Sequence, residues 1–162
     1  MDSQTPLPKN NDEEMRNIIE EARVILPGLQ AVFGFQTAAV FSDRFSDLAN
    51  YARVCHLIGL ALIVVSMAML MTPAVYYRAQ HGMATLRMVS TSRKSIRGAL
   101  IPMSLGFSLD MLTVMSLATD ALAFSIGAAV LTLAMFAGLW YVIPKRDRAV
   151  TKDARRDKSH VT

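Results

Sequence analysis

Apolar residues gather into four long blocks along the chain, and shorter polar stretches separate the blocks. A helix that crosses the hydrocarbon core of a bilayer needs about 20 mostly apolar residues. Four stretches meet or approach this length: residues 24–42, 54–77, 99–118 and 122–143. The pattern therefore predicts an all-α integral membrane protein that folds as a four-helix bundle, with a transmembrane domain over residues 11–146.

The segment before the first span has a different pattern. Residues 1–10 are polar and contain two prolines, so we expect them to be disordered. From Asn11 onward, apolar residues recur at helical spacing behind an acidic first turn, which predicts a short N-terminal amphipathic helix. Pro27 follows this helix, and two outcomes stay open: a bend at the membrane surface, or one continuous helix.

The connections between the spans differ in length. Residues 78–98 form the longest connection and carry five basic residues. Only a few residues around Asp120 separate the third and fourth spans, so these two spans should form a tight antiparallel hairpin. Pro102 falls in the first turn of the third span, where proline is tolerated. The charged tail, residues 147–162, is predicted to be disordered.

Basic residues are distributed unevenly between the two sides of the predicted membrane. The N-terminal segment, residues 78–98 and the C-terminal tail hold fifteen of the seventeen Lys and Arg, and the other side holds only Arg44 and Arg53. Cytoplasmic segments carry the excess of Lys and Arg, so both termini should be cytoplasmic. The basic tail should meet anionic lipid headgroups. No basic, aromatic-interleaved face remains for a nucleic acid, so we expect no such partner.

Aromatic residues mark the ends of two spans. The second span ends at Tyr76, Tyr77 and Arg78, and the fourth span ends at Trp140 and Tyr141. Such residues favour the headgroup region of a bilayer because one end of the side chain is apolar and the other is polar. We expect these five side chains to act as membrane anchors.

Asp110 is the sharpest candidate for chemistry, because it lies near the middle of the third span. An ionised carboxylate there is costly unless it is paired, hydrated or protonated. Matching the depth of the spans brings Gln36, Ser66 and Thr132 level with Asp110, where they could donate hydrogen bonds. Three interpretations stay open: a proton or cation site, an aspartate that fixes helix packing, or a span boundary that places Asp110 nearer water.

Small and amide residues predict where helices pack. Gln30 and Gly34 in the first span and Gly106 in the third suit close helix contacts. The fourth span has two lines of small residues, one with Ala123, Gly127, Ala134 and Gly138, the other with Ala121, Ser125, Ala128 and Thr132. One line can serve the third span and the other a second copy of the chain, which would make a homo-oligomer. The sequence does not rank the two lines.

Other chemistry finds little support in the sequence. The single cysteine and three widely separated histidines make no metal site at ligand spacing. No nucleophile elbow, phosphate-binding loop or dinucleotide-binding motif occurs, so we expect neither a cofactor nor an enzyme. The eleven methionines sit mostly in apolar blocks, where methionine is an adaptable filler. A structural or accessory role follows, and the alternative is a proton- or cation-coupled transporter subunit centred on Asp110.

Short motifs between residues 20 and 146 stand together in this chain: Glu21-Ala22-Arg23-Val24, Gly28-Leu29-Gln30, Phe33-Gly34-Phe35, Arg44-Phe45, Pro73 to Arg78, and Leu139-Trp140-Tyr141 with Pro144. With these motifs the chain resembles a family of small bacterial inner-membrane proteins with four predicted helices and unknown function. The resemblance implies a location in the inner membrane, and members are sometimes labelled sodium:proton antiporters. Where the family has a histidine before the arginine that ends the second span, this chain has Tyr77.

Overall fold

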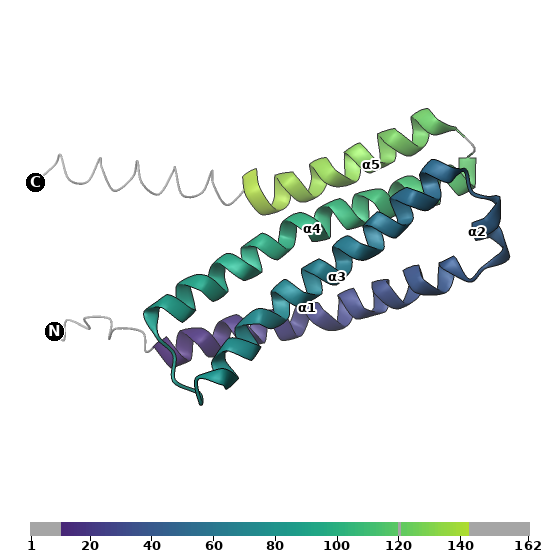
Figure 1. Cartoon of the computed structure of the whole chain (residues 1–162). Coiled ribbons are helices and arrows are strands. Elements are labelled where there is room, and N and C mark those ends of the chain that lie inside the picture. The colour runs from purple at the N-terminus through teal and green to yellow at the C-terminus, as the bar shows by residue number, and fades with distance from the viewer. Residues whose placement is uncertain (1–10, 120, 143–162) are drawn as a thin grey trace, which may run out of the picture. The chain divides into compact units, whose positions relative to one another are not determined.

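Helices make up nearly all of the part of the chain that the computed structural model describes, residues 11–119 and 121–142. In chain order they are α1 (Asn11–Val40), α2 (Asp43–Asp47), α3 (Asn50–Ala79), α4 (Leu86–Thr119) and α5 (Leu122–Ala137), followed by a π-helical turn, η1 (Gly138–Val142) (Figure 1). No strand occurs among these residues, and the all-α prediction is confirmed. The segments that we expect to be disordered, residues 1–10 and 147–162, lie outside the described residues.

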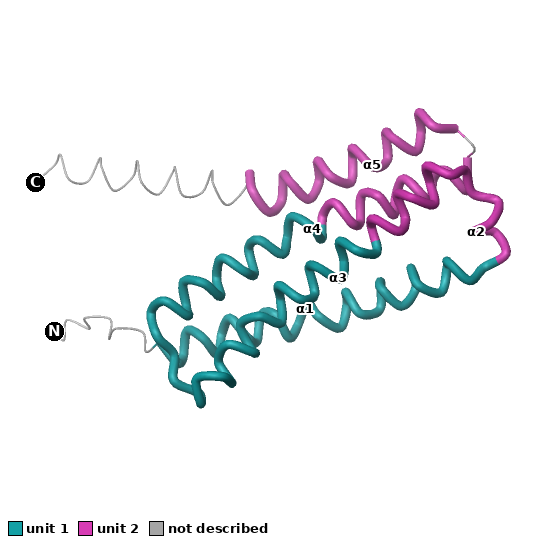
Figure 2. The backbone as a smooth tube through the Cα atoms, viewed as in Figure 1, with its two compact units in different colours: residues 1–42, 60–103 teal, residues 43–59, 104–162 magenta. Residues whose placement is uncertain are grey.

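Two compact units divide the chain, and the long helices α3 and α4 each pass from one unit into the other (Figure 2). Unit 1 holds residues 1–42 and 60–103, which include α1, the end of α3 and the beginning of α4. Unit 2 holds residues 43–59 and 104–162, which include α2, the beginning of α3, the end of α4, and α5.

In unit 1, α1 is one helix that runs through Pro27, so the continuous alternative is the one observed. Its acidic first turn contacts α4 and the turn that precedes α4. The Ala84 N–H of that turn donates to Asp12 Oδ1 over 2.7 Å, and Glu14 forms an ion pair with Arg93 of α4. One face of the helix is buried along its length, at Met15, Ile18, Ala22, Leu29 and Gln36. The amphipathic segment and the first apolar stretch are therefore parts of a single element.

The connection between α3 and α4 is much shorter than the expected loop over residues 78–98. The chain turns within six residues, where His81 and Gly82 adopt positive φ values of 52° and 80° and the Gly82 N–H donates to the Tyr77 carbonyl over 3.1 Å. Helix α4 then begins at Leu86, so Pro102 lies inside α4 rather than in its first turn. The loop prediction was wrong because basic residues end an apolar block without ending a helix; Lys and Arg are good helix formers.

Serine hydroxyls join α3 to α4 within unit 1. Ser66 Oγ donates to the Ala99 carbonyl over 2.9 Å, and Ser95 Oγ donates to the Met69 carbonyl over 2.8 Å. The two bonds run in opposite directions between the helices. They place small hydroxyl side chains at the contact, as expected for helices that pack in lipid, where apolar side chains gain little by leaving the solvent.

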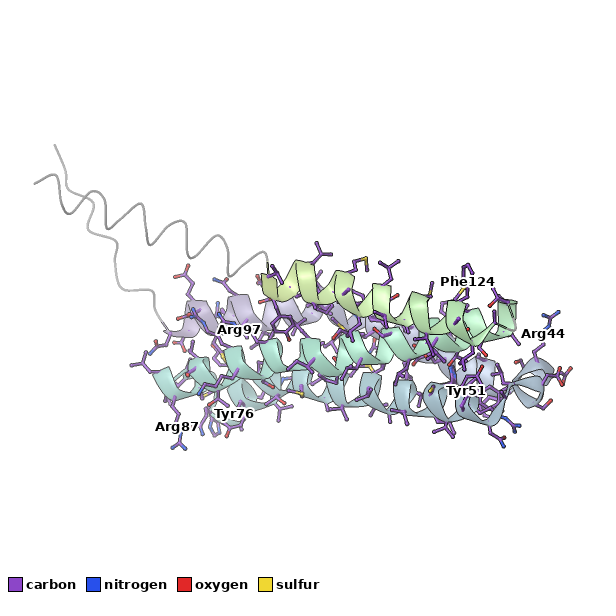
Figure 3. All side chains as sticks on the ribbon, turned by 90° about the horizontal axis from the view of Figure 1, so that it is seen from above. Arg44, Tyr51, Tyr76, Arg87, Arg97 and Phe124 are labelled. Carbon is purple, nitrogen blue, oxygen red and sulfur yellow. The ribbon has the colours of Figure 1, made fainter. Side chains whose placement is uncertain are left out.

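The described surface is rich in large apolar side chains. Phe35 is 78% exposed, and Phe124, labelled in Figure 3, is 71% exposed. Several of the buried residues are polar, namely Gln36, His56, Ser66, Ser92, Ser104, Ser108, Thr113, Ser116 and Ser125. Such a distribution is unfavourable in water and suits a lipid environment. Three helical segments are long and apolar enough to cross a membrane, Asn50–Ala79, Leu86–Thr119 and Leu122–Val142, and α1 is not among them.

Candidate functional site

The candidate site is a histidine and aspartate pair inside unit 2. His56 lies in the second turn of α3, and Asp110 lies in the half of α4 that belongs to the same unit. The distance from His56 Nδ1 to Asp110 Oδ1 is 3.5 Å, and the two side chains are 7% and 17% exposed. Asp110 therefore has an ionisable neighbour within reach of its carboxylate, which is how the cost of an acidic side chain in a membrane span can be met.

Antiparallel contacts between α3 and α4 on one side of the pair, toward the beginning of α3, set its register. Tyr51 Oη and Ser116 Oγ are hydrogen-bonded at 2.9 Å. Thr113 Oγ1 shares its proton between the Leu109 carbonyl of its own helix, at 3.0 Å, and the Ala52 carbonyl of α3, at 3.3 Å. From the first contact to the second, the residue on α3 advances from Tyr51 to Ala52, while the residue on α4 goes back from Ser116 to Thr113. The same register carried on brings His56 to Asp110, so the pair follows from how the two helices are aligned.

Gly59 lets the two helices approach each other next to the pair. A Cβ atom on this residue would lie 3.2 Å from Asp110 Oδ1, 3.3 Å from the Gly106 carbonyl oxygen and 3.5 Å from Leu109 Cβ. Two of these distances are tighter than ordinary van der Waals contact, and one of them is to backbone. The glycine therefore makes room for the aspartate carboxylate against α3. Gly106, predicted as a packing residue, does lie at this close contact.

Short helix α2 contributes an aromatic wall to the site. The Phe45 ring contacts the His56 ring edge-on, with 5.6 Å between centroids and an interplanar angle of 63°. The corner between α2 and α3 is held by Arg53, whose Nε donates to the Leu48 carbonyl over 3.0 Å, and Leu48 itself is buried. The apolar Phe45 ring limits the water that can reach the imidazole. A charge on His56 or Asp110 must therefore be stabilised mainly by the other residue of the pair.

The chemistry open to this pair is the binding of a proton. A neutral imidazole can accept a proton and a carboxyl group can donate one, and the resulting imidazolium and carboxylate stabilise each other. At a separation of 3.5 Å, opposite unit charges attract by about 5 kcal/mol at an effective dielectric constant of about 20. Within the described residues, no group of three or more His, Cys, Asp or Glu side chains could hold a metal ion.

Ser66 and Thr132, two of the three residues predicted to surround Asp110, donate to backbone carbonyls. Thr132 Oγ1 donates to the Ala128 carbonyl of its own helix over 2.9 Å, and Ser66 gives its proton to Ala99 in unit 1. Gln36 is buried on α1, also in unit 1. The expected hydrogen bonds from Ser66 and Thr132 to Asp110 are therefore not formed, because each hydroxyl has a backbone acceptor elsewhere.

Sequence reasoning missed His56, which it set aside as one of three isolated histidines. The turn between α3 and α4 indicates which residues of the two helices lie opposite each other. Antiparallel helices joined by a tight turn bring together residues equally far from that turn, and with the turn at Gly82 this count places His56 opposite Asp110. The expected loop over residues 78–98 hid the turn, and the register with it.

Several predicted packing residues are open to the surroundings. Gln30 and Gly34 on α1 are exposed, and a Cβ atom at Gly34, Gly127 or Gly138 would meet nothing within 4 Å. The structure does rank the two small-residue lines of α5: Ser125 is fully buried, with Ala121, Ala128 and Thr132 half-buried beside it, whereas Ala123, Gly127 and Ala134 are exposed. The line with Gly127 therefore faces outward, which leaves it open for a second copy of the chain, whereas the line with Ser125 is the buried one.

The predicted anchors lie at the ends of α3 and α5. Tyr76 and Arg78 are exposed and Tyr77 is half-buried in the last turn of α3; Tyr76 is seen beside Arg87 in Figure 3. In η1, Trp140 and Tyr141 are half-buried, and the Trp140 ring packs on Phe136 with 4.6 Å between centroids. The aromatic side chains at both places are partly open to the surroundings, as a role at the headgroup level requires.

The chain was compared with curated proteins, with solved structures and with models of protein families. Neither a search of curated proteins nor a search of solved structures returns a significant match. The model of a family of unknown function, DUF6328, matches residues 7–144. This match includes every element that the structure describes, from α1 to η1, and the pair of His56 and Asp110. Since the match extends over most of its length, the chain belongs to the DUF6328 family of unknown function.

Proposed function

We propose that this chain is a multi-pass membrane protein that binds and releases a proton at the pair of His56 and Asp110, as an accessory subunit without enzymatic activity. The observation that carries the proposal is the 3.5 Å distance between His56 Nδ1 and Asp110 Oδ1 in a buried part of unit 2. Ionisable residues inside membrane spans are costly, and such residues mark proton and ion pathways in membrane proteins.

A proton fits this site better than a metal cation. Calcium takes six to eight oxygen ligands and magnesium six, whereas the pair offers one carboxylate and one imidazole. A proton needs only one lone pair, on His56 or on Asp110. When the proton is on His56, the carboxylate of Asp110 balances its charge. The chemistry of an antiporter subunit would thus centre on the exchange of a proton at Asp110, with His56 as the second proton-binding group.

A packing role for the same pair is the second candidate, and the antiparallel contacts favour it. Tyr51 with Ser116 and Thr113 with Ala52 form polar contacts of the same two helices, and buried polar pairs of this kind can fix a helix register. In that case His56 and Asp110 would hold α3 against α4 without any change in protonation during the protein's work.

Location and topology complete the proposal. The fifteen-to-two distribution of Lys and Arg supports cytoplasmic termini in a bacterial inner membrane. The three helices long enough to span support a membrane bundle, and residues 24–42 of α1 would add the fourth span. An even number of spans is what puts both termini on one side. The basic tail would then lie against anionic headgroups of the cytoplasmic leaflet.

Infrared spectroscopy of the purified protein separates the two candidates. We expect the wild-type protein to show a carboxylic acid C=O band that changes with pH, and the same change to be missing from Asp110→Asn. Glu13→Gln is the matched control, since it removes one carboxylate from an exposed position on α1. A difference spectrum between wild type and Asp110→Asn without any pH-dependent carboxyl band, in protein that remains folded, would refute the proton site and leave the packing role.

A further inference from the structure

A groove with two chemically different ends runs between α1 and α3 in unit 1. Its polar end is a cavity of about 240 Å³, lined by Arg16, Glu20 and Arg23 of α1 and by Tyr77 and Arg78 of α3. Its apolar end is a cavity of about 230 Å³. The two cavities share the lining residues Ile19, Arg23 and Ala74, so they form one continuous surface, here called the α1–α3 groove.

The polar end carries an excess of positive charge. Three guanidinium groups, those of Arg16, Arg23 and Arg78, face it together with the single carboxylate of Glu20. A neighbouring cavity between α1 and α4 has balanced charge instead, because Arg93 and Arg97 face Glu14 and Glu21 there, and Glu14 already pairs with Arg93. The planar guanidinium donates paired hydrogen bonds to phosphate oxygens, so the uncompensated charge of the α1–α3 groove fits a phosphate group.

The apolar end continues directly from these arginines. Leu26 and Pro27 of α1 and Leu70 and Met71 of α3 line it, and Leu70 is buried while Met71 is half open to the surroundings. A ligand that fills both ends must carry a phosphate and, next to it, a flexible apolar chain. Free phosphate or a soluble phosphate ester would leave the apolar end unused.

The place of the groove along the helices agrees with such a ligand. Tyr76, Tyr77 and Arg78 stand in the last turn of α3, where an apolar block gives way to polar residues. Aromatic and basic residues at this position lie at the depth of lipid headgroups. A phosphate bound by Arg78 would therefore be at headgroup level, and the apolar end would extend toward the middle of the bilayer.

We propose that the α1–α3 groove binds one anionic phospholipid, with its phosphate on Arg16, Arg23 and Arg78 and one acyl chain against Leu26, Pro27, Leu70 and Met71. Glu20 limits the site to a headgroup that leaves room for a carboxylate and adds hydrogen-bond donors of its own, as the glycerol of phosphatidylglycerol does. Among the described residues, the lining of the groove includes neither His56 nor Asp110.

Native mass spectrometry of the full chain in mild nonionic detergent tests the site, with phosphatidylglycerol and phosphatidylcholine added in equal amounts. We expect one phosphatidylglycerol to be retained in preference to phosphatidylcholine. Arg78→Gln and Arg16→Gln should each weaken retention by about tenfold, since each removes a charge-assisted hydrogen bond. Arg87→Gln is the matched control, because it removes an exposed arginine near the same turn but outside the groove.

A second variant tests the apolar end. Ala74 lies where the two ends meet, so Ala74→Phe should block the acyl chain and abolish retention while every arginine stays in place. If this variant fails to fold, as judged by circular dichroism, the arginine variants decide alone. Equal retention of the two lipids, or equal effects of Arg87→Gln and Arg78→Gln, would overturn the proposal. Full displacement of the lipid by inorganic phosphate would also overturn it, since that would make the groove a phosphate site.

Discussion

Gly59→Ala should destabilise the contact between α3 and α4 beside the proposed proton site. The added methyl group would lie 3.2 Å from Asp110 Oδ1 and 3.3 Å from the Gly106 carbonyl, so the helices must separate by a few tenths of an ångström or Asp110 must turn away. Overpacking of this kind typically costs about 1–3 kcal/mol. Replacing a glycine within a helix by alanine gains about 1 kcal/mol, so the net change alone is hard to interpret.

A matched variant removes that ambiguity. Gly127→Ala makes the same substitution inside a helix where the new Cβ meets nothing within 4 Å, so it collects the helix-propensity gain without the clash. We expect Gly59→Ala to be less stable than Gly127→Ala by about 1–3 kcal/mol. For a chain of this size each kcal/mol moves the midpoint of thermal unfolding by about 2–4 °C. Thermal unfolding in detergent measures the difference, and equal midpoints would show that α3 and α4 are not in close contact at Gly59.

Three further predictions concern topology, the tail and assembly. In a Cys55→Ser background, impermeant thiol reagents should label Asn50→Cys in intact cells and should miss the exposed position Ser90→Cys, and the opposite result would invert the topology. A peptide of residues 145–162 should bind anionic vesicles by up to about 1 kcal/mol per basic residue and lose this binding at high salt, whereas equal binding to neutral vesicles would contradict it. Gly127→Leu should not destabilise the monomer, because its line of small residues faces outward, and it should weaken crosslinking between copies; an unchanged crosslinking pattern would remove the case for a dimer there.

The sequence predicted the helices well where a long apolar block alone determines the secondary structure. The apolar blocks over residues 54–77 and 122–143 correspond to α3 and to α5 with η1, because a long run without charges has few other stable forms. The beginning of α4 was misjudged by more than ten residues, since Arg93, Lys94 and Arg97 interrupt the apolar pattern but remain helical. Hydropathy reports which part of a helix suits lipid, and it does not report where the helix begins.

Of the two residues of the candidate site, the sequence predicted Asp110 and missed His56. Asp110 stood out because a carboxylate in an apolar block is costly wherever it points, so a single residue carried the information. Its partner His56 needed the register of two helices, which depends on the turn at Gly82 and on the close approach at Gly59. The rotation of α5 was also beyond the sequence. Both of its faces carry small residues, and only the packing in unit 2 buries the line with Ser125.

A double-mutant cycle across His56 and Asp110, measured at one pH below neutrality and one above it, tests the central claim most directly. Unfolding free energies of wild type, His56→Gln, Asp110→Asn and the double variant give the coupling between the two side chains. The proton-binding account predicts a coupling of about 0.5–3 kcal/mol that differs between the two pH values, because the charges on the pair change as it takes up a proton. A coupling of zero, or one that is the same at both pH values, would contradict it.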